Sequence, residues 1–160
     1  MGDWTPFADE NYRARLQVGL RKAGVPEGAA PQLTEGDYKS LVTKSGGEFT
    51  VEGVPKIDLA EAKSLQEEGA LFIDVRSEAG YVKGHIPGAV GLDLQTQLTK
   101  ESLAEVAEKD QVVIFYCDGI YCYKSANACA KAITWGYTNV LYFSGGEPAW
   151  SKAGYPIATN

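Results

Sequence analysis

The segment Gln111–Ser125 reads QVVIFYCDGIYCYKS, and its first part has the composition of a buried β-strand. All five residues of Val112–Tyr116 are β-branched or aromatic, as in a strand that is covered on both faces. From Ser125 onward the chain is rich in alanine, which favours a helix with small packing residues. Cys117 therefore lies where a central strand gives way to a helix. Backbone N–H groups and the positive end of the helix dipole converge at such a junction and favour the thiolate, the reactive form of cysteine.

Strand-like and helix-like segments alternate on both sides of this junction. Short strands are expected at residues 56–57, 70–75, 89–90, 112–116 and 139–143, with a long connection at 76–88. Helices are expected from the capping residue Asp58 to Gly69, at residues 102–109, from Ser125 to Trp135, and as a last turn around Trp150. Repeated βα units of this length predict a parallel sheet with helices on both faces. In such sheets ligands bind beyond the carboxyl ends of the strands, which is where Cys117 lies.

Residues 1–54 lack the alternation of strand-like and helix-like segments found in the rest of the chain. They are expected to form an N-terminal helical extension of an α/β domain that spans residues 55–158. A first helix is expected to begin at Asp9. A second, short helix is expected to begin after Thr34 and to end at Gly46-Gly47. The side chains of this second helix that are expected to face inward are those of Tyr38, Leu41 and Val42. The extension contains no catalytic constellation.

The composition limits the class of protein. With 160 residues, 44% of them hydrophobic, the chain is long enough to bury a core. Its net charge of −6 argues against binding to nucleic acid or to an anionic membrane, and it disfavours capture of anionic substrates over a distance. No apolar run approaches the length of a membrane span, and no signal-peptide pattern is present. A soluble protein is expected, and both a cytoplasmic and a periplasmic location fit the sequence.

The chain has three cysteines, Cys117, Cys122 and Cys129, all within the strand–loop–helix region. An odd number of cysteines is not a disulfide framework. Four residues separate Cys117 from Cys122, and the single histidine, His85, is distant in sequence. This spacing is a poor match to a zinc site, so no metal is expected. Nothing in the sequence indicates a bound cofactor.

Four motifs resemble those of the rhodanese-like (sulfurtransferase) domain family, in the family's order and spacing. They are Phe72–Arg76 (FIDVR), Gly84–Ala89 (GHIPGA), the strand with Cys117, its loop and Ser125, and Gly145-Gly146 followed by Trp150, Gly154 and Pro156. The resemblance covers roughly two-thirds of the chain, from about Lys56 to Pro156. It implies a three-layer α/β fold with a central, mostly parallel sheet flanked by helices. The catalytic cysteine of the family falls on Cys117.

The resemblance implies a persulfide enzyme. Cys117 would take a sulfane sulfur from a small donor (thiosulfate, a polysulfide or a persulfide), hold it as Cys–S–SH, and pass it to a thiol or protein acceptor. Loop amides curled towards the thiolate would form a nest for the negative charge. Lys124 resembles the basic residue that closes the family's loop, and Ser125 is expected to cap the following helix. The residues of the active loop that are candidates for substrate binding are Asp118, Gly119, Ile120, Tyr121, Cys122, Tyr123 and Lys124.

The active loop departs from the usual pattern of the family in length and in charge. From Cys117 to Lys124 it spans eight positions, two more than usual, and it contains a second cysteine. Asp118 stands where arginine is common, and no arginine follows Arg76. A carboxylate beside the nucleophile repels thiosulfate, so a persulfide or polysulfide donor or a protein thiol is favoured. The related phosphatases are excluded, because their bidentate phosphate clamp requires arginine.

Several side chains in or near the loop allow two interpretations. Cys122 either resolves a persulfide or sulfenic acid on Cys117 by forming a disulfide, or fills the loop as a small residue. Tyr121 and Tyr123 either line the site or pack outward. Cys129, in the alanine-rich helix, is expected to lie in the core.

Three further residues are expected to support the site. Asp74 and Arg76, after the second strand, are expected to brace the neighbouring turn, with Arg76 paired to Glu78 or to backbone carbonyls. His85 is either a base for the nucleophile or a structural part of the turn Gly84–Gly88. The glycines and the proline of that turn favour the structural role, because they explain the stretch as backbone geometry.

Two other functional classes remain open beside a single-domain sulfurtransferase. One is a non-catalytic or sensory rhodanese-like module that binds a protein partner. The other is a thiol–disulfide redox protein that uses Cys117 and Cys122. Only the sulfurtransferase requires a sulfur adduct on Cys117.

Overall fold

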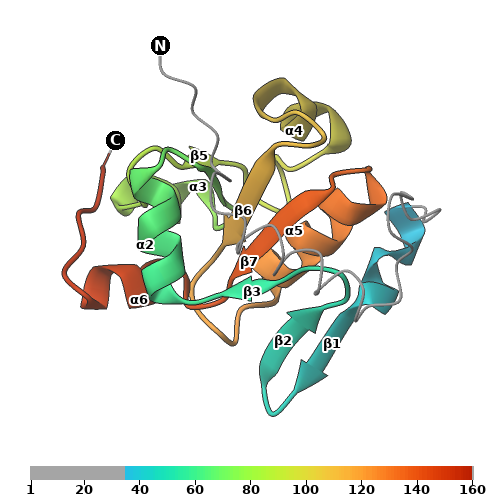
Figure 1. Ribbon diagram of the computed structural model, residues 1–160, viewed down its shortest axis with the longest axis horizontal. Coiled ribbons are helices and arrows are strands. Elements are labelled where there is room, and N and C mark those ends of the chain that lie inside the picture. The colour runs from blue at the N-terminus through green and yellow to red at the C-terminus, as the bar shows by residue number, and fades with distance from the viewer. Residues whose placement is uncertain (1–34, 160) are drawn as a thin grey trace.

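The computed structural model describes residues 35–159 of the 160-residue chain. Their main elements form three layers, with a sheet between two sets of helices (Figure 1). The first expected helix, which begins at Asp9, lies outside the described residues. Within residues 35–159, no helix has both the length and the apolar character needed to cross a membrane.

The sheet contains five parallel strands in the order β3-β7-β6-β4-β5. The strands are β3 (Lys56–Ile57), β4 (Leu71–Asp74), β5 (Val90–Gly91), β6 (Val112–Tyr116) and β7 (Asn139–Phe143). β6 is the central strand, and its Ile114 pairs with Phe72 of β4 and with Leu141 of β7. All five residues of β6 are buried, as expected for a parallel strand with both faces covered. The predicted parallel sheet is confirmed.

Five α-helices accompany the sheet in the described part of the chain. They are α2 (Leu59–Glu67), α3 (Glu78–Lys83), α4 (Lys100–Val106), α5 (Tyr123–Thr134) and α6 (Gly146–Lys152). Four of them lie near their predicted positions. The exception is α3, which begins after the cap Ser77 inside the expected long connection and has no buried residue. A short helix without an apolar face leaves no hydrophobic periodicity in the sequence, and therefore it was not predicted.

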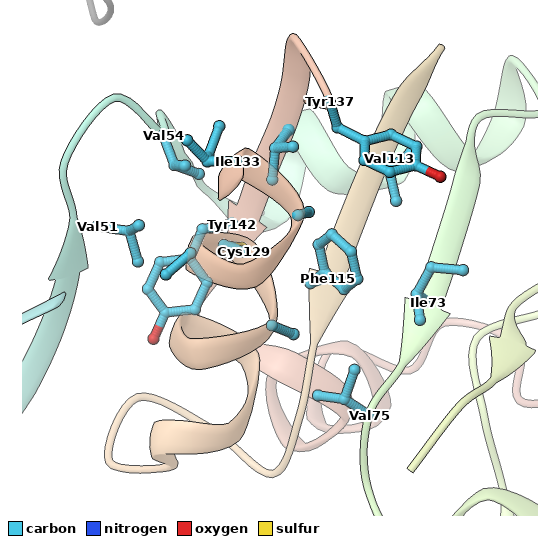
Figure 2. Close-up of a cluster of buried hydrophobic side chains, with 14 of the residues drawn as sticks. Val51, Val54, Ile73, Val75, Val113, Phe115, Cys129, Ile133, Tyr137 and Tyr142 are labelled. Atoms are coloured by element: carbon cyan, nitrogen blue, oxygen red, sulfur yellow. The ribbon is translucent and has the colours of Figure 1, made fainter. Parts of the chain in front are cut away.

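Alternate side chains of the central strand enter two separate hydrophobic cores. Val113 and Phe115 of β6 lie in one core with residues of α5 such as Ile133 (Figure 2). Ile114 lies in the other core, with Trp150 of α6 and side chains of α2. Because successive residues of a strand point to opposite faces, both faces of the sheet are covered and the three layers follow.

A short helix follows Thr34 as expected, but residues 42–46, where that helix was expected to continue, form the first strand and part of the turn of a β-hairpin that runs to Val51, so this part of the prediction is wrong. After the 3-10 helix η1 (Glu35–Leu41), β1 (Val42–Ser45) pairs antiparallel with β2 (Glu48–Val51). The turn is Gly46-Gly47, with φ angles of +61° and +88°. Positive φ at both central residues suits a two-residue hairpin turn, and glycine adopts it at no steric cost. The two glycines therefore reverse the chain here instead of ending a helix.

The hairpin and η1 pack along α5 (Figure 1). Leu41 and Val51 are buried in the core that α5 shares with the sheet, and Val42 and Phe49 pack against that core. The hairpin is thus part of the packing of the α/β unit. The domain boundary after residue 54 stays a prediction.

Removal of the N-terminal cap of α2 is expected to cost about 1 kcal/mol of stability. Asp58 Oδ1 accepts a hydrogen bond of 2.8 Å from the Glu61 N–H, and Glu61 Oε1 accepts one of 3.3 Å from the Asp58 N–H. Urea unfolding of Asp58→Ala measures the loss. The matched control is Glu67→Gln on the same helix, which removes only the surface ion pair with Lys63. The control is expected to lose less than about 0.5 kcal/mol, and equal losses in the two variants would contradict the cap's contribution.

Candidate active site

Cys117 is the first residue after the central strand β6, at the carboxyl edge of the sheet between β4 and β7. Its side chain is only 1% exposed and belongs to the core beside α5. Its carbonyl oxygen accepts a hydrogen bond of 3.0 Å from the Glu147 N–H. The first turn of α6 therefore holds the backbone at the end of β6.

A disulfide between Cys117 and Cys122 closes the active loop, with the two Cα atoms 6.4 Å apart. Within the loop the Cys122 N–H donates to the Gly119 carbonyl oxygen at 3.1 Å, and Gly119 has a φ of +128°. Cys122 is also the N-cap residue of α5. One sulfur of the disulfide thus lies at the end of the central strand and the other at the start of the following helix.

The sulfur of Cys117 accepts no hydrogen bond from a backbone N–H among the described residues. The amide nest that the sequence suggests is therefore not formed in the disulfide-closed loop, and it stays a prediction for the open loop.

The expected capping role of Ser125 is wrong. Because α5 begins at Tyr123, Ser125 is its third residue, where its side chain is fully buried and its Oγ has no hydrogen-bond partner within residues 35–159.

Arg76 brings a cation from the end of β4 to the loop. Its Nη2 lies 2.7 Å from Asp74 Oδ2 and donates to the Gly84 carbonyl oxygen at 2.5 Å. Its Nη1 lies 3.8 Å from Asp118 Oδ1 and 3.8 Å from Glu147 Oε2. Burial acts to lower the pKa of Arg76, but hydrogen bonding to Asp74 and the charges of Asp74 and Asp118 hold that pKa above its ordinary value.

The arrangement around Arg76 contains contacts that the sequence did not predict. A brace to the turn at Gly84 was expected, and the structure forms it, but with Asp74 as the carboxylate partner instead of Glu78. The contact between Arg76 and the rim of the loop was not expected. Its only signal is that the segment after β4 and the segment after β6 leave neighbouring parallel strands at the same edge.

The rim of the loop has an excess of negative charge. Asp74, Asp118 and Glu147 share one guanidinium group, so three negative charges against one positive charge leave a net charge of about −2. The side chain of Asp118 is 68% exposed and that of Glu147 is 21% exposed. A small anion that approaches Arg76 therefore meets carboxylates before it meets the cation.

The two tyrosines of the loop point outward to different neighbours. Tyr121 is 70% exposed, and its ring lies against the hairpin turn, where a Cβ added at Gly47 would be 3.1 Å from Tyr121 Cε1. Tyr123 is 43% exposed, and its hydroxyl oxygen accepts a hydrogen bond of 3.1 Å from Gln95 Nε2. The β1–β2 turn and the segment around Gln95 thus flank the loop. Ile120 and Lys124, by comparison, are half-buried.

His85 is anchored in its own turn. It is 4% exposed, its Nδ1 lies 2.8 Å from the Tyr81 carbonyl oxygen, and its ring stacks on the Tyr81 ring with centroids 3.9 Å apart. Its backbone exchanges two hydrogen bonds with Ala158. None of these contacts involves the active loop, so the geometry favours a structural His85 over a base for Cys117.

Cys129 lies apart from the disulfide, inside the core. Its side chain is fully buried in α5, and its Sγ donates to the Leu141 carbonyl oxygen at 3.6 Å. Burial raises the pKa of this thiol well above its ordinary value. Cys129 therefore packs as a small apolar residue and is no part of the site.

The chain is similar to known proteins over the region that contains the site. Residues 58–153 match the Rhodanese-like domain family. A sulfurtransferase of Allochromatium vinosum is 37% identical over 90 residues, which are 56% of this chain and 79% of that protein. The thiosulfate sulfurtransferase GlpE of Haemophilus influenzae is 31% identical over 100 residues, which are 62% of this chain and 90% of that protein.

Solved structures are similar over the same region. The BH2092 protein from Bacillus halodurans has a TM-score of 0.60 at 25% identity, over 66% of this chain and 77% of that one. The human single-domain sulfurtransferase TSTD1 shares the fold at a TM-score of 0.53 and 23% identity, over 62% of this chain and 96% of that one. With a parallel five-stranded sheet, a cysteine at the end of its central strand and a family match over more than half of its length, the chain belongs to the rhodanese-like domain family.

Proposed function

We propose that this protein is a sulfurtransferase that carries a sulfane sulfur as a persulfide on Cys117 and passes it to a thiol or another nucleophilic acceptor. The observation that carries the proposal is the position of Cys117, at the carboxyl end of the central strand and directly before a short loop and the N-terminus of α5. Parallel sheets bind ligands at this edge, and the helix dipole favours an anion there. The relatives in A. vinosum and H. influenzae, which are named sulfurtransferases, support the same class of reaction.

The proposed reaction begins with the open loop. The disulfide is reduced first, because only a thiolate attacks a sulfane sulfur. With a persulfide donor RSSH, the Cys117 thiolate attacks the outer sulfur, the S–S bond of the donor breaks, and the donor leaves as the thiolate RS⁻. Cys117 then holds the outer sulfur as Cys–S–SH. Attack by an acceptor on that outer sulfur returns Cys117 to the thiolate.

The charges at the rim favour a persulfide or a singly charged polysulfide as the donor over thiosulfate. Arg76 is already surrounded by carboxylates, and the exposed Asp118 lies on the solvent side of this group. Thiosulfate is a dianion and would approach against the net negative charge. Lys124 follows the loop and adds one further cation.

Mass spectrometry of the intact, reduced protein tests the proposal. After treatment with a polysulfide or with glutathione persulfide, Cys122→Ser is expected to gain about 32 Da, the mass of one sulfur atom. The adduct is expected to be absent from Cys117→Ser and present in the double variant Cys122→Ser with Cys129→Ser, which serves as the control for the buried thiol. A mass gain that survives in Cys117→Ser, or no gain with any donor, would contradict the assignment.

The disulfide gives specific support to a second function, thiol–disulfide exchange by the Cys117–Cys122 pair. A protein of that class would cycle between dithiol and disulfide without holding a sulfane sulfur. Its signature is a loss of about 2 Da, equal to two hydrogens, that requires both cysteines and occurs with an oxidant that contains no sulfane sulfur. A polysulfide-dependent adduct on Cys117 distinguishes the sulfurtransferase from this alternative.

A further inference from the structure

We infer that Cys122 is the resident acceptor of the sulfur on Cys117, so that the loop discharges the sulfur as hydrogen sulfide and closes as the disulfide. A dithiol, either a small molecule or a protein, then reopens the loop. The inference rests on the proposed function for one step only, the loading of sulfur on Cys117. It adds an acceptor, a product and a class of reductant to that function.

The reach between the two thiols supports the first step. The Cα atoms of Cys117 and Cys122 are 6.4 Å apart, within the range that a disulfide spans without movement of the backbone. Cys117 is held by the hydrogen bond from the Glu147 N–H to its carbonyl oxygen, and Cys122 is held as the N-cap of α5. Both ends of the loop are thus fixed by elements of the fold. An external acceptor must diffuse in, whereas Cys122 is already in place.

The position of Cys122 also suits a nucleophile. As the N-cap of α5 it lies at the positive end of the dipole of a 12-residue helix. Its side chain makes no capping hydrogen bond to the first turn. The independent observation that points to a reaction at this helix terminus is the disulfide itself, which joins Cys122 to Cys117 and to no other residue.

The discharge step balances in atoms and electrons. In Cys117–S–SH the inner sulfur is bonded to the outer sulfur, and the Cys122 thiolate attacks the inner one. The bond between the inner and outer sulfurs breaks, and the outer sulfur leaves with the bonding electron pair as HS⁻. A new bond joins Cys117 and Cys122. The outer sulfur is reduced from the sulfane to the sulfide level, and the two cysteines together supply the two electrons.

The reopening step is expected to begin at Cys122. Cys117 is 1% exposed in the closed loop, whereas Cys122 is half-buried, so an external thiolate reaches the Cys122 sulfur first. That attack forms a mixed disulfide on Cys122 and releases the Cys117 thiolate, the group that loads sulfur. A second thiol on the same reductant then frees Cys122 and leaves the reductant as a disulfide. A dithiol fits this sequence better than a monothiol, because its second thiol is already present when the mixed disulfide forms.

The experiment measures sulfide and protein mass together. Wild-type protein is reduced, freed of reductant without oxygen, and mixed with one equivalent of glutathione persulfide. It is expected to release about one equivalent of sulfide and to lose about 2 Da relative to the reduced protein. Cys122→Ser is expected to keep the gain of about 32 Da and to release at least tenfold less sulfide in the same time. Cys129→Ser is the matched control and is expected to behave as the wild type does.

The outcomes separate the inference from the proposed function. If Cys122→Ser loads sulfur but the wild type keeps its adduct as long as the variant does, the inference fails and the sulfurtransferase stands. If neither protein loads sulfur, both fail. Cys122→Ala serves as a second variant, and circular dichroism shows whether each variant is folded. The measurement on the wild type does not depend on any substitution. Catalytic sulfide release is expected with dithiothreitol as reductant, and an equal rate with an equal thiol concentration of mercaptoethanol would overturn the reopening step.

Discussion

Arg76→Met is expected to lower the free energy of unfolding by about 3–5 kcal/mol, the range for removing one partner of a buried ion pair. The Arg76 side chain is 7% exposed and the Asp74 side chain is fully buried, with Nη2 and Oδ2 2.7 Å apart. Without the guanidinium, Asp74 stays as a buried carboxylate without a cation, and the Gly84 carbonyl oxygen loses its donor. Guanidinium chloride unfolding followed by circular dichroism measures the loss.

The double variant Asp74→Asn with Arg76→Met separates the buried charge from the lost packing. It removes the carboxylate as well as the cation, so no charge is left unpaired in the core. We expect the double variant to be more stable than Arg76→Met alone, because most of the cost of the single variant comes from the isolated carboxylate. If the double variant is the less stable of the two, the remaining hydrogen bond from the Arg76 backbone N–H to the Asp74 carboxylate outweighs the cost of the unpaired charge.

Gly146→Ala is expected to cost about 3 kcal/mol of stability and to slow sulfur loading on the folded protein. Gly146 has a φ of +63°, which costs a residue with a Cβ roughly 1–2 kcal/mol. The added Cβ would also collide with the carbonyl group of Cys117 and the N–H of Gly119, and all of these atoms belong to the backbone. Relief of the collision moves α6 away from the loop and weakens the hydrogen bond from the Glu147 N–H, a further loss of about 1 kcal/mol.

Gly154→Ala is the matched control for this prediction. Gly154 has a similar φ of +81°, but an added Cβ there would meet no atom of the described part of the chain within 4 Å. The control therefore tests the backbone term alone and is expected to lose roughly 1–2 kcal/mol without any change in loading. Urea unfolding gives the two stabilities, and the rate of adduct formation, measured with each substitution in the Cys122→Ser background, gives the loading. Equal losses of stability and unchanged loading in both variants would show that the contact between α6 and Cys117 does not shape the site.

The sheet and the place of Cys117 could be predicted because local sequence determines them. The apolar run Val112–Tyr116 has no polar face to expose, so it requires cover on both sides and becomes the central strand. A residue that follows a central parallel strand must lie at the carboxyl edge. The hairpin was missed for the opposite reason. Gly46-Gly47 ends a helix as readily as it turns a hairpin, and the choice is made by packing on α5, which no local pattern contains.

The parts of the site that could not be predicted depend on contacts between distant segments. Arg76 meets Asp118 and Glu147 because the segments after β4, β6 and β7 leave adjacent strands at one edge, and the strand order is a property of the whole sheet. Ser125 was expected to cap α5, but the helix begins earlier in the chain, at Tyr123, with Cys122 as its N-cap. An alanine-rich stretch predicts the body of a helix and leaves its first residue undetermined.

Because Cys129 is buried, the number of reactive thiols in the folded protein depends only on whether the Cys117–Cys122 loop is closed or open. The chain has three cysteines: Cys117 and Cys122 form the disulfide, and Cys129 is buried within α5. A colorimetric thiol reagent applied to the folded protein should therefore count no fast-reacting sulfhydryl in the closed loop and two in the open loop. The remaining sulfhydryl becomes reactive only when the core opens, so the same titration reports global unfolding as a separate, slower phase.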